Sequence, residues 1–338
     1  MELRQMEYFL AVVDHGGVNR AAAALRVAQP SLSQAVRKLE KDLGTELFHR
    51  VGRGLVLAPA GEALIGPARM ILRESEAAAN AVRTVGQVGG GRIDIATLSD
   101  MSMDPLSVWV AKFRAQFPDV RFHIEERDDA VEVANLVRSG ACEIGFVASE
   151  APMDDLITEH LTDQKFVLVC PPGTDSYWPD PVPIEALARV PFVMGGHGTA
   201  TREYIENSLR EHGVEPRIVM EVPQRGAVLP IVLSGGGAAV IPLRIALDAR
   251  HRGGTVRELS PTLARPLVAL YRKGRVTRAT TEFLTSSKRS LQEWLDAISG
   301  HMERGHSLVE SASLASLAAD HRVRERHRAE TDVVPFDQ

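Results

Sequence analysis

One short segment near the start of the chain carries side chains suited to nucleic-acid recognition. With a turn of about 100° per residue, residues 30–43 place Leu32, Val36, Leu39 and Leu43 along one apolar stripe. The opposite side carries Pro30, Ser33, Gln34, Arg37 and Lys41. Hydroxyl, amide and cationic groups of this kind hydrogen-bond base edges and phosphates in a DNA major groove. An ordinary amphipathic surface helix has the same pattern, so this helix alone leaves both interpretations open.

The flanking segments predict the elements that would position this helix. Apolar residues at helical spacing over residues 3–13 predict a first helix, which Gly16 and Gly17 end. Asn19 is expected to cap a short helix over residues 20–25, followed by a turn at 26–29. Residues 47–57 place two apolar segments around a tip that carries Arg50 and Arg53, as in a hairpin wing.

Three helices followed by a basic-tipped hairpin predict a winged helix-turn-helix, with double-stranded promoter DNA as its partner. The candidate DNA-binding residues are Asn19, Gln29, Pro30, Ser31, Ser33, Gln34, Arg37, Lys41, Arg50 and Arg53.

At this point the chain resembles the LysR-type transcriptional regulators. The resemblance rests on residues 19–22 (Asn-Arg-Ala-Ala), 27–33 (Val-Ala-Gln-Pro-Ser-Leu-Ser), 37–40 (Arg-Lys-Leu-Glu), 43–50 (Leu-Gly-Thr-Glu-Leu-Phe-His-Arg) and 60–62 (Ala-Gly-Glu). It covers about residues 1–298 and implies a DNA-binding head, a dimerising helix and an effector-sensing domain. One departure is Ala28, where the family usually has serine, so the recognition helix lacks a capping hydroxyl worth about 1 kcal/mol.

A long helix is expected after Pro59, reaching about Gln87 and kinked near Pro67. Alternating spacings of four and three residues predict a coiled-coil seam, which consists of Leu64, Ala68, Ile71, Ser75, Ala78, Val82 and Val85. A helix packed on its own domain fits the same pattern. A homodimer is favoured because two heads bind two half-sites, and dimers that pair into tetramers remain open. Glycines at 86 and 89–91 predict a hinge.

The following two hundred residues alternate between predicted strands and helices, as in an α/β domain. Residues 118–147 and 216–241 follow a similar strand-helix-strand pattern, which indicates two related lobes. We therefore expect a two-lobed, periplasmic-binding-protein-like fold with a ligand in the cleft. Lobe one comprises residues 92–162 and 266–298, and lobe two comprises residues 163–265.

Ligands in such lobes bind beyond the carboxyl ends of strands, near helix N-termini. The residues at those positions are Ser99, Asp100, Ser102, Asp129, Ala130, Gly198, Thr199, Thr201 and Arg202. Local helix capping is the alternative role for each of them. Their hydroxyls and arginine favour an organic acid or another oxygen-rich effector. If Asp100 and Asp129 face the cleft as carboxylates, a neutral or amine-bearing ligand is the rival.

Neither catalysis nor metal binding is indicated by the remaining motifs. The chain has no nucleophile elbow, no Cys/His pairing and no dinucleotide fingerprint. His197 stands in a glycine-rich stretch but lacks a Walker lysine and a second ligand, so we expect no cofactor and no metal. The peroxide-sensing branch of the resembled family uses two cysteines in the second lobe. Cys142 is expected in the first lobe, which argues against that mode, and Cys142 and Cys170 are expected to be structural.

The composition is that of an ordinary chain with several packed units. Its 338 residues have a net charge of −5, so a chain that is basic throughout is excluded, whereas a local basic surface is not. The most apolar stretch, 228–242, is interrupted by proline and glycines, and no membrane association is expected. The charged residues near the start do not resemble a secretory signal, so the expected location is the cytoplasm.

The sequence therefore predicts four parts. They are a winged helix-turn-helix (1–59), a linker helix (60–88), an effector-binding domain (89–298) and a tail (299–338). The tail is rich in Ala, Arg, Glu and His and is expected to be mobile or partly helical. Its basic residues are interpreted as a solvated charge run, with contact to DNA or to a partner as the alternative. The transcription machinery is a further candidate partner of the protein. Competing functions are a small-molecule-binding protein and an enzyme with an appended DNA-binding domain.

Overall fold

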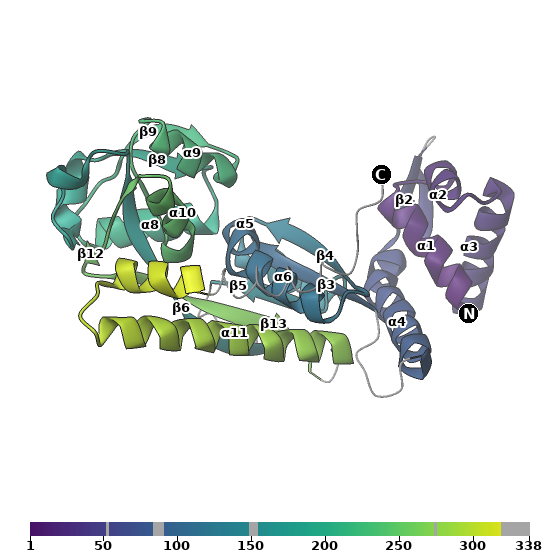
Figure 1. Ribbon diagram of the computed structural model, residues 1–338. Coiled ribbons are helices and arrows are strands. Elements are labelled where there is room, and N and C mark those ends of the chain that lie inside the picture. Colours follow the sequence, from purple (N-terminus) through teal and green to yellow (C-terminus); the bar gives the residue numbers. More distant parts are fainter. Residues whose placement is uncertain (52–53, 84–90, 149–154, 274–275, 319–338) are drawn as a thin grey trace, which may run out of the picture.

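The computed structural model describes residues 1–51, 54–83, 91–148, 155–273 and 276–318. Figure 1 shows a small helical domain at the N-terminal end, a long helix that leads away from it, and two α/β lobes beyond. A long helix near the C-terminus runs along the lobes. Among the described helices, none combines the length and the apolar composition that a bilayer crossing requires.

The N-terminal domain contains α1 (Leu3–Asp14), α2 (Val18–Leu25) and α3 (Gln29–Leu43). Leu32, Val36 and Leu39 of α3 are buried against the first two helices, as their spacing predicts. Leu43, which we expected on the same stripe, is 38% exposed because the helix ends there and Gly44 turns the chain away. Helix α2 begins at Val18, two residues earlier than expected. Its N-cap is therefore Gly17, and Asn19 lies within the first turn.

The predicted wing is present as the antiparallel pair β1 (Phe48–Val51) and β2 (Gly54–Leu57). Leu47 is buried and Phe48 packs on Phe9, which joins the hairpin to the helical core. The tip, residues 52–53, lies outside the described residues, and so does the side chain of Arg50.

The linker helix is α4 (Pro59–Arg83), which continues through Pro67. In the first half of α4, the predicted coiled-coil residues are not available to a second copy of the helix. Leu64, Ala68 and Ile71 pack into a cluster with Met6, Phe9 and Leu10 of α1. In this part the alternative interpretation of the pattern, a helix packed on its own domain, is correct, because α1 offers an apolar face at the same spacing. Ala78 is exposed, while the side chain of Val82 and residues 84–90 lie outside the described part.

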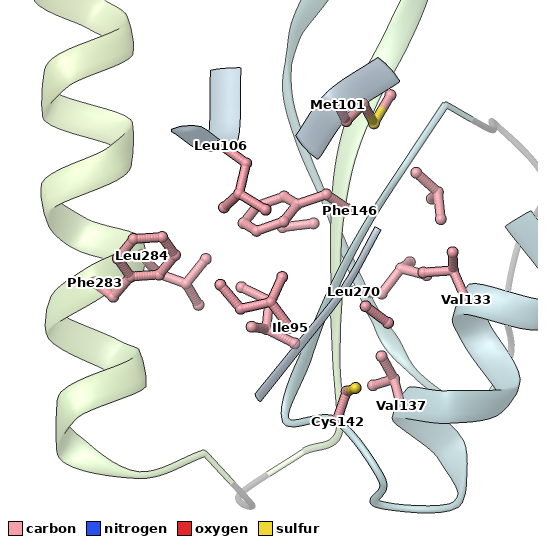
Figure 2. Packing of buried hydrophobic residues seen from close by; sticks show 14 of the residues in the cluster. Ile95, Met101, Leu106, Val133, Val137, Cys142, Phe146, Leu270, Phe283 and Leu284 are labelled. Atoms are coloured by element: carbon pink, nitrogen blue, oxygen red, sulfur yellow. The ribbon is translucent and has the colours of Figure 1, made fainter. Parts of the chain in front are cut away.

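Lobe one is built on one end of a seven-stranded sheet with the order β10-β6-β13-β5-β3-β4, in which β11 pairs with β6. Its strands are β3 (Gly91–Leu98), β4 (Val120–Arg127), β5 (Ile144–Val147), and parts of β6 (Ile157–Cys170) and β13 (Leu263–Tyr271). Helices α6 (Ser107–Gln116) and α11 (Arg278–Met302) pack on one side, and α7 (Ala130–Arg138) packs on the other. Figure 2 shows Phe283 of α11 and Val133 of α7 approaching Ile95 and Phe146 from opposite sides.

Lobe two contains the other ends of β6 and β13 together with β10 (Ala239–Pro242) and β11 (Thr255–Arg257). A parallel pair, β8 (Pro191–Gly195) and β9 (Arg217–Val222), and a short pair, β7 (Val182–Pro183) and β12 (Leu259–Ser260), complete its strands. Helices α8 (Ala200–Glu211), α9 (Val228–Leu233) and α10 (Leu243–His251) cover them. Its buried side chains form two clusters, separate from the lobe-one core.

As far as it is described, the segment after residue 298 is helical and packed, so it fits the partly helical interpretation of the tail and not the mobile one. Helix α11 continues to Met302, and residues 308–318 form a further helix, which we call the C-terminal helix. Leu308, Val309 and Ala312 are buried in the core of lobe two. A capping box joins Ser307 and Glu310, each side chain accepting from the other residue's backbone N–H. Residues 319–338, including the basic run, lie outside the described part.

Because Val309 is fully buried, removing its two methyl groups should destabilise lobe two. We expect Val309→Ala to lower the free energy of unfolding by about 2 kcal/mol, measured by urea denaturation. Leu317→Ala is the matched control, since Leu317 lies on the same helix and is 50% exposed; its effect should stay below about 0.5 kcal/mol. Equal effects of the two substitutions would contradict the observed packing.

Candidate functional site

The outer face of α3 is the candidate DNA interface. Gln29, Pro30, Ser31, Gln34, Arg37 and Lys41 are exposed, and Ser33 is half-buried. Gln29 Nε2 donates to Ser33 Oγ at 2.9 Å, which orders the first turn where Ala28 provides no side-chain cap. Arg37 forms no hydrogen bond or ion pair with any residue in the described ranges, so its guanidinium is free to meet a base edge or phosphate.

The residues predicted on this face do not all lie together. Asn19 is exposed at the start of α2, on a different helix from the main set. Arg53 lies outside the described residues, and for Arg50 only the backbone within β1 is described. The predicted wing contacts of these two arginines therefore stay predictions.

A cavity of about 70 Å³ lies between the two lobes, at the carboxyl ends of β3 and β8. Most of its wall is apolar, with Val193, Ile205, Val228, Leu229 and Ile241 among its lining residues. Three charged side chains also line it, namely Asp100, Arg202 and Arg225. Because two of these are basic, the wall has a net positive charge.

Asp100 is buried and held by two arginines of lobe two. Arg265 Nη2 donates to Asp100 Oδ2, and Arg225 Nη1 lies 3.2 Å from Asp100 Oδ1. Burial lowers the pKa of Arg265, while the charge of Asp100 acts in the opposite direction. The acid is thus neutralised inside the protein and does not present an unpaired negative charge to the cleft.

Arg225 is not saturated by these contacts. Its Nη1 donates to Thr201 Oγ1 at 2.5 Å, but its buried Nη2 has no hydrogen-bond partner among the described residues. A buried cationic donor without a partner is costly, so an incoming oxyanion at this point would be stabilised.

Four of the predicted ligand residues line the cavity, namely Asp100, Thr199, Thr201 and Arg202. Thr199 is the N-cap of α8, and its hydroxyl donates to the Gly196 carbonyl at 2.9 Å. Thr201 accepts from both Arg225 and Arg265. Arg202 is engaged by Glu221 at 2.6 Å and Glu206 at 2.7 Å, so it is less available to a ligand than Arg225.

The other predicted ligand residues do not line the cavity, namely Ser99, Ser102, Asp129, Ala130 and Gly198. Asp129 caps α7 by accepting from the Glu132 N–H at 2.9 Å, and Ser102 donates to Glu126. For these two residues local hydrogen bonding, the alternative role, accounts for the side chain. Asp129 therefore gives no reason to expect a cationic ligand.

Sequence reasoning missed Arg225, Arg265 and Gln164. Arg265 Nε donates to Gln164 Oε1 at 3.0 Å, and the two residues face each other across β6 and β13. Of the three, only Arg225 lines this cavity, and Arg265 supports it by bonding Asp100 and Thr201. Their proximity comes from folding three distant segments together, so no local spacing reveals it. Of the three residues, only Arg265 stands out in the sequence, because it is a charged residue within the apolar pattern of a central strand.

Both cysteines are buried, Cys142 in lobe one and Cys170 in lobe two. Burial raises the pKa of each thiol to about 12. At neutral pH roughly one thiol in a hundred thousand is then ionised, and a thiol of this kind reacts slowly with peroxide. In the described ranges no cluster of His, Cys, Asp and Glu side chains could hold a metal ion.

The linker helix contacts lobe one directly. Arg73 of α4 is 8% exposed; its guanidinium donates to the Gly140 carbonyl at 2.7 Å and to Asp94 at 3.1 Å. Asp94 is buried and also pairs with Arg92. Two turns earlier on α4, a Cβ at Gly66 would collide with the Ser139 carbonyl oxygen, so the backbones are in contact at this point.

Family models match most of the chain. The helix-turn-helix model of bacterial regulatory proteins of the lysR family matches residues 3–62, and the LysR substrate binding domain matches residues 86–292. A regulator named YnfL from Escherichia coli is 30% identical over 246 residues, which cover 72% of this chain and 82% of that protein. The nitrogen assimilation regulatory protein nac from Escherichia coli is 28% identical, over 72% of this chain and 78% of its own length.

Solved structures share the fold. A full-length OxyR variant from Pseudomonas aeruginosa has a TM-score of 0.65 at 21% identity, covering 86% of this chain and 95% of that one. Full-length CbnR in complex with its target DNA has a TM-score of 0.61 at 22% identity, covering 86% of this chain and 100% of that one.

We expect Arg37→Ala to reduce specific DNA binding by about 1 to 3 kcal/mol while non-specific binding changes little, because the guanidinium projects freely from α3. Anisotropy titrations of the DNA upstream of the gene and of a scrambled duplex, across a salt series, measure both. Lys38→Ala is the matched control, since Lys38 is the next residue on α3 and pairs with Glu2 at 2.6 Å. Unchanged discrimination in Arg37→Ala would remove α3 from the interface.

Proposed function

The chain belongs to the LysR family of bacterial transcriptional regulators, and from this premise we propose that its inter-lobe cavity binds a small organic acid that changes how the protein holds promoter DNA. The family consists of DNA-binding regulators with an effector-binding domain. The observation that carries the proposal is the buried, unpartnered Nη2 of Arg225 at a mainly apolar wall. A carboxylate would satisfy that donor, and an apolar body would contact Val228 and Leu229.

The cavity is small for a ligand, because binding pockets usually exceed roughly 300 Å³. Among the described residues, four polar contacts hold lobe one against lobe two. Asp100 pairs with Arg225 and with Arg265, the Ala200 N–H donates to the Asp128 carbonyl at 3.0 Å, and Arg244 donates to Asp104 at 2.9 Å. A ligand carboxylate at Arg225 competes with Asp100 for the same cation. Effector binding therefore exchanges a contact between the lobes for a contact with the ligand and alters the lobe angle.

The same geometry supports the proposal of an acid over the rival ligand class, an amine-bearing effector. An amine-bearing effector would require a free carboxylate in the cleft, yet Asp100 is neutralised by two arginines and Asp129 caps α7. An amine would also meet the Nη2 donor of Arg225, to which an ammonium group offers no acceptor. We therefore propose an acid rather than an amine.

We further propose that two copies of the chain pair through their effector domains, so that two heads meet two half-sites. Exposed apolar side chains occur at corresponding places in the lobes, namely Ile124 on β4 and Val219 and Met220 on β9, with Val131 nearby on α7. Strand β4 is an edge of the seven-stranded sheet. A two-fold axis can bring the lobe-one patch of one copy against the lobe-two patch of the other.

Coupling between effector and DNA then passes through α4. One face of this helix packs on α1, and the other contacts lobe one through Gly66 and Arg73. The Arg73 guanidinium lies at the carboxyl end of α7, where a cation is stabilised by the helix carbonyls. We propose that a rotation of lobe one is transmitted to the DNA-binding head through this contact.

A thermal-shift screen of small organic acids, with the amide and amine counterpart of each, tests the effector class. A ligand at 100 times its dissociation constant adds about 2.7 kcal/mol of stability, so acids should raise Tm by several degrees and their counterparts should not. Arg225→Met should abolish the shift. Arg210→Met is the control, because Arg210 is exposed on the same lobe and does not line the cavity. Equal shifts from acids and amides would refute the acid preference.

Arg73→Met should loosen lobe one from the linker helix, because it breaks the buried pair with Asp94 and frees two backbone carbonyls. We expect the amide protons of residues 135–141 to exchange about tenfold faster, which corresponds to about 1.4 kcal/mol of local stability. Arg69→Met is the control, since Arg69 is on the same helix but pairs with Asp14 of α1. No difference between the variants would exclude this contact as the coupling element.

A further inference from the structure

A second cavity, larger than the first, lies where the two lobes meet, beside strands β6 and β13. Its volume is about 280 Å³, close to the lower limit of roughly 300 Å³ for small-molecule sites. Strand β6, helix α10 of lobe two, helix α11 and the C-terminal helix all contribute to its wall.

The C-terminal part of the chain forms much of this wall. Six lining residues lie beyond residue 292, where the match to the LysR substrate binding domain ends. They are Trp294, Leu295, Ile298, Ser299, Met302 and Leu308. Trp294 Nε1 donates to Ser316 Oγ at 3.1 Å, so the C-terminal helix fixes the indole at the cavity. The cavity is thus a property of this chain's own C-terminal packing.

The lining is amphipathic. Leu243, Leu267, Leu291 and Leu295 provide an apolar wall together with the Trp294 ring. On the polar side, Arg244 stacks over that ring at 4.4 Å from its centroid and donates to Asp104 at 2.9 Å. An aliphatic or aromatic body would contact the leucines and the ring.

The charges at the cavity favour an acid. Asp104 is bonded by Arg244, and Asp163 hydrogen-bonds His160 at 2.9 Å, so both carboxylates have partners. Lys165 also lines the cavity, and its side chain has no ion pair or hydrogen bond with any described residue. Its ammonium is therefore available to a carboxylate, and Arg244 bonds Asp104 through Nε alone, which leaves the other guanidinium donors available.

We propose that this cavity is a second small-molecule site, which binds an amphipathic acid with its apolar body against Trp294 and its carboxylate at Lys165. The occupant contacts both lobes, since Leu291 belongs to lobe one and Leu243 to lobe two. Asp104 in this wall and Asp100 in the first cavity lie on the same short segment. Occupancy of one site therefore changes affinity at the other, and the effect is reciprocal.

Calorimetric titration with octanoate, octan-1-ol and octylamine tests the site. Octanoate should bind the wild-type protein more tightly than either counterpart. Ser299→Phe should abolish binding because the ring fills the cavity from an exposed rim position. Lys165→Met should weaken octanoate about two- to fivefold, the range expected for a partly exposed ion pair, and should leave octanol unchanged. Lys273→Met, an exposed lysine away from the cavity, is the matched control and should behave as wild type.

Three results would overturn the proposal. They are no octanoate binding at millimolar concentration, binding that survives Ser299→Phe, and a loss of binding in Arg225→Met while Ser299→Phe binds normally. The last result would place octanoate in the first cavity, so failure of the second site is distinguishable from failure of the effector proposal. Circular dichroism of each variant establishes that it is folded.

Discussion

The antiparallel pairing of β6 with β13 is the interaction on which the two-lobed arrangement depends. The register runs from Phe166 opposite Leu263 in lobe two to Ile157 opposite Tyr271 in lobe one, with a shift between Leu267 and Val268. Both strands therefore contribute side chains to both cores, and the two lobes share one hydrogen-bonded ribbon. A ribbon of two strands twists and bends more easily than a wide sheet, so lobe motion is concentrated at this place.

Much of the fold could be predicted because it is determined by local periodicity and by motif. The three-helix head, the wing, the linker helix and the alternating lobes all leave patterns within single elements, and the recognition helix buries the stripe that its spacing predicts. The linker seam was ambiguous for a physical reason. Residues at positions 64, 68 and 71 form an apolar stripe that fits a partner helix and the face of α1 equally well, and only the three-dimensional packing decides.

The candidate effector site was only partly accessible to sequence reasoning. Thr199 and Thr201 were found because helix N-termini at strand ends follow a general rule of α/β domains. Arg225 and Arg265 come from a turn and a strand far along the chain, and their meeting with Asp100 depends on lobe closure. The sequence predicted the C-terminal helix only as partial helicity of the tail, although the Ser307 to Glu310 capping box is visible in it. The burial of this helix in lobe two depends on contacts with distant segments, which no local pattern reveals.

The C-terminal helix also has a consequence for biosynthesis. A nascent chain emerges from its amino end, and domains fold largely as units in that order. The DNA-binding head and the start of the linker have all their buried partners by residue 72, and the core of lobe one is complete at Leu291. The core of lobe two is complete only when Ala315 has been synthesised, because this core includes side chains of the C-terminal helix. A truncated chain released early from the ribosome would therefore have a folded DNA-binding domain and an incompletely folded lobe two. We expect such a chain to compete with the full-length protein for promoter DNA without responding to the effector.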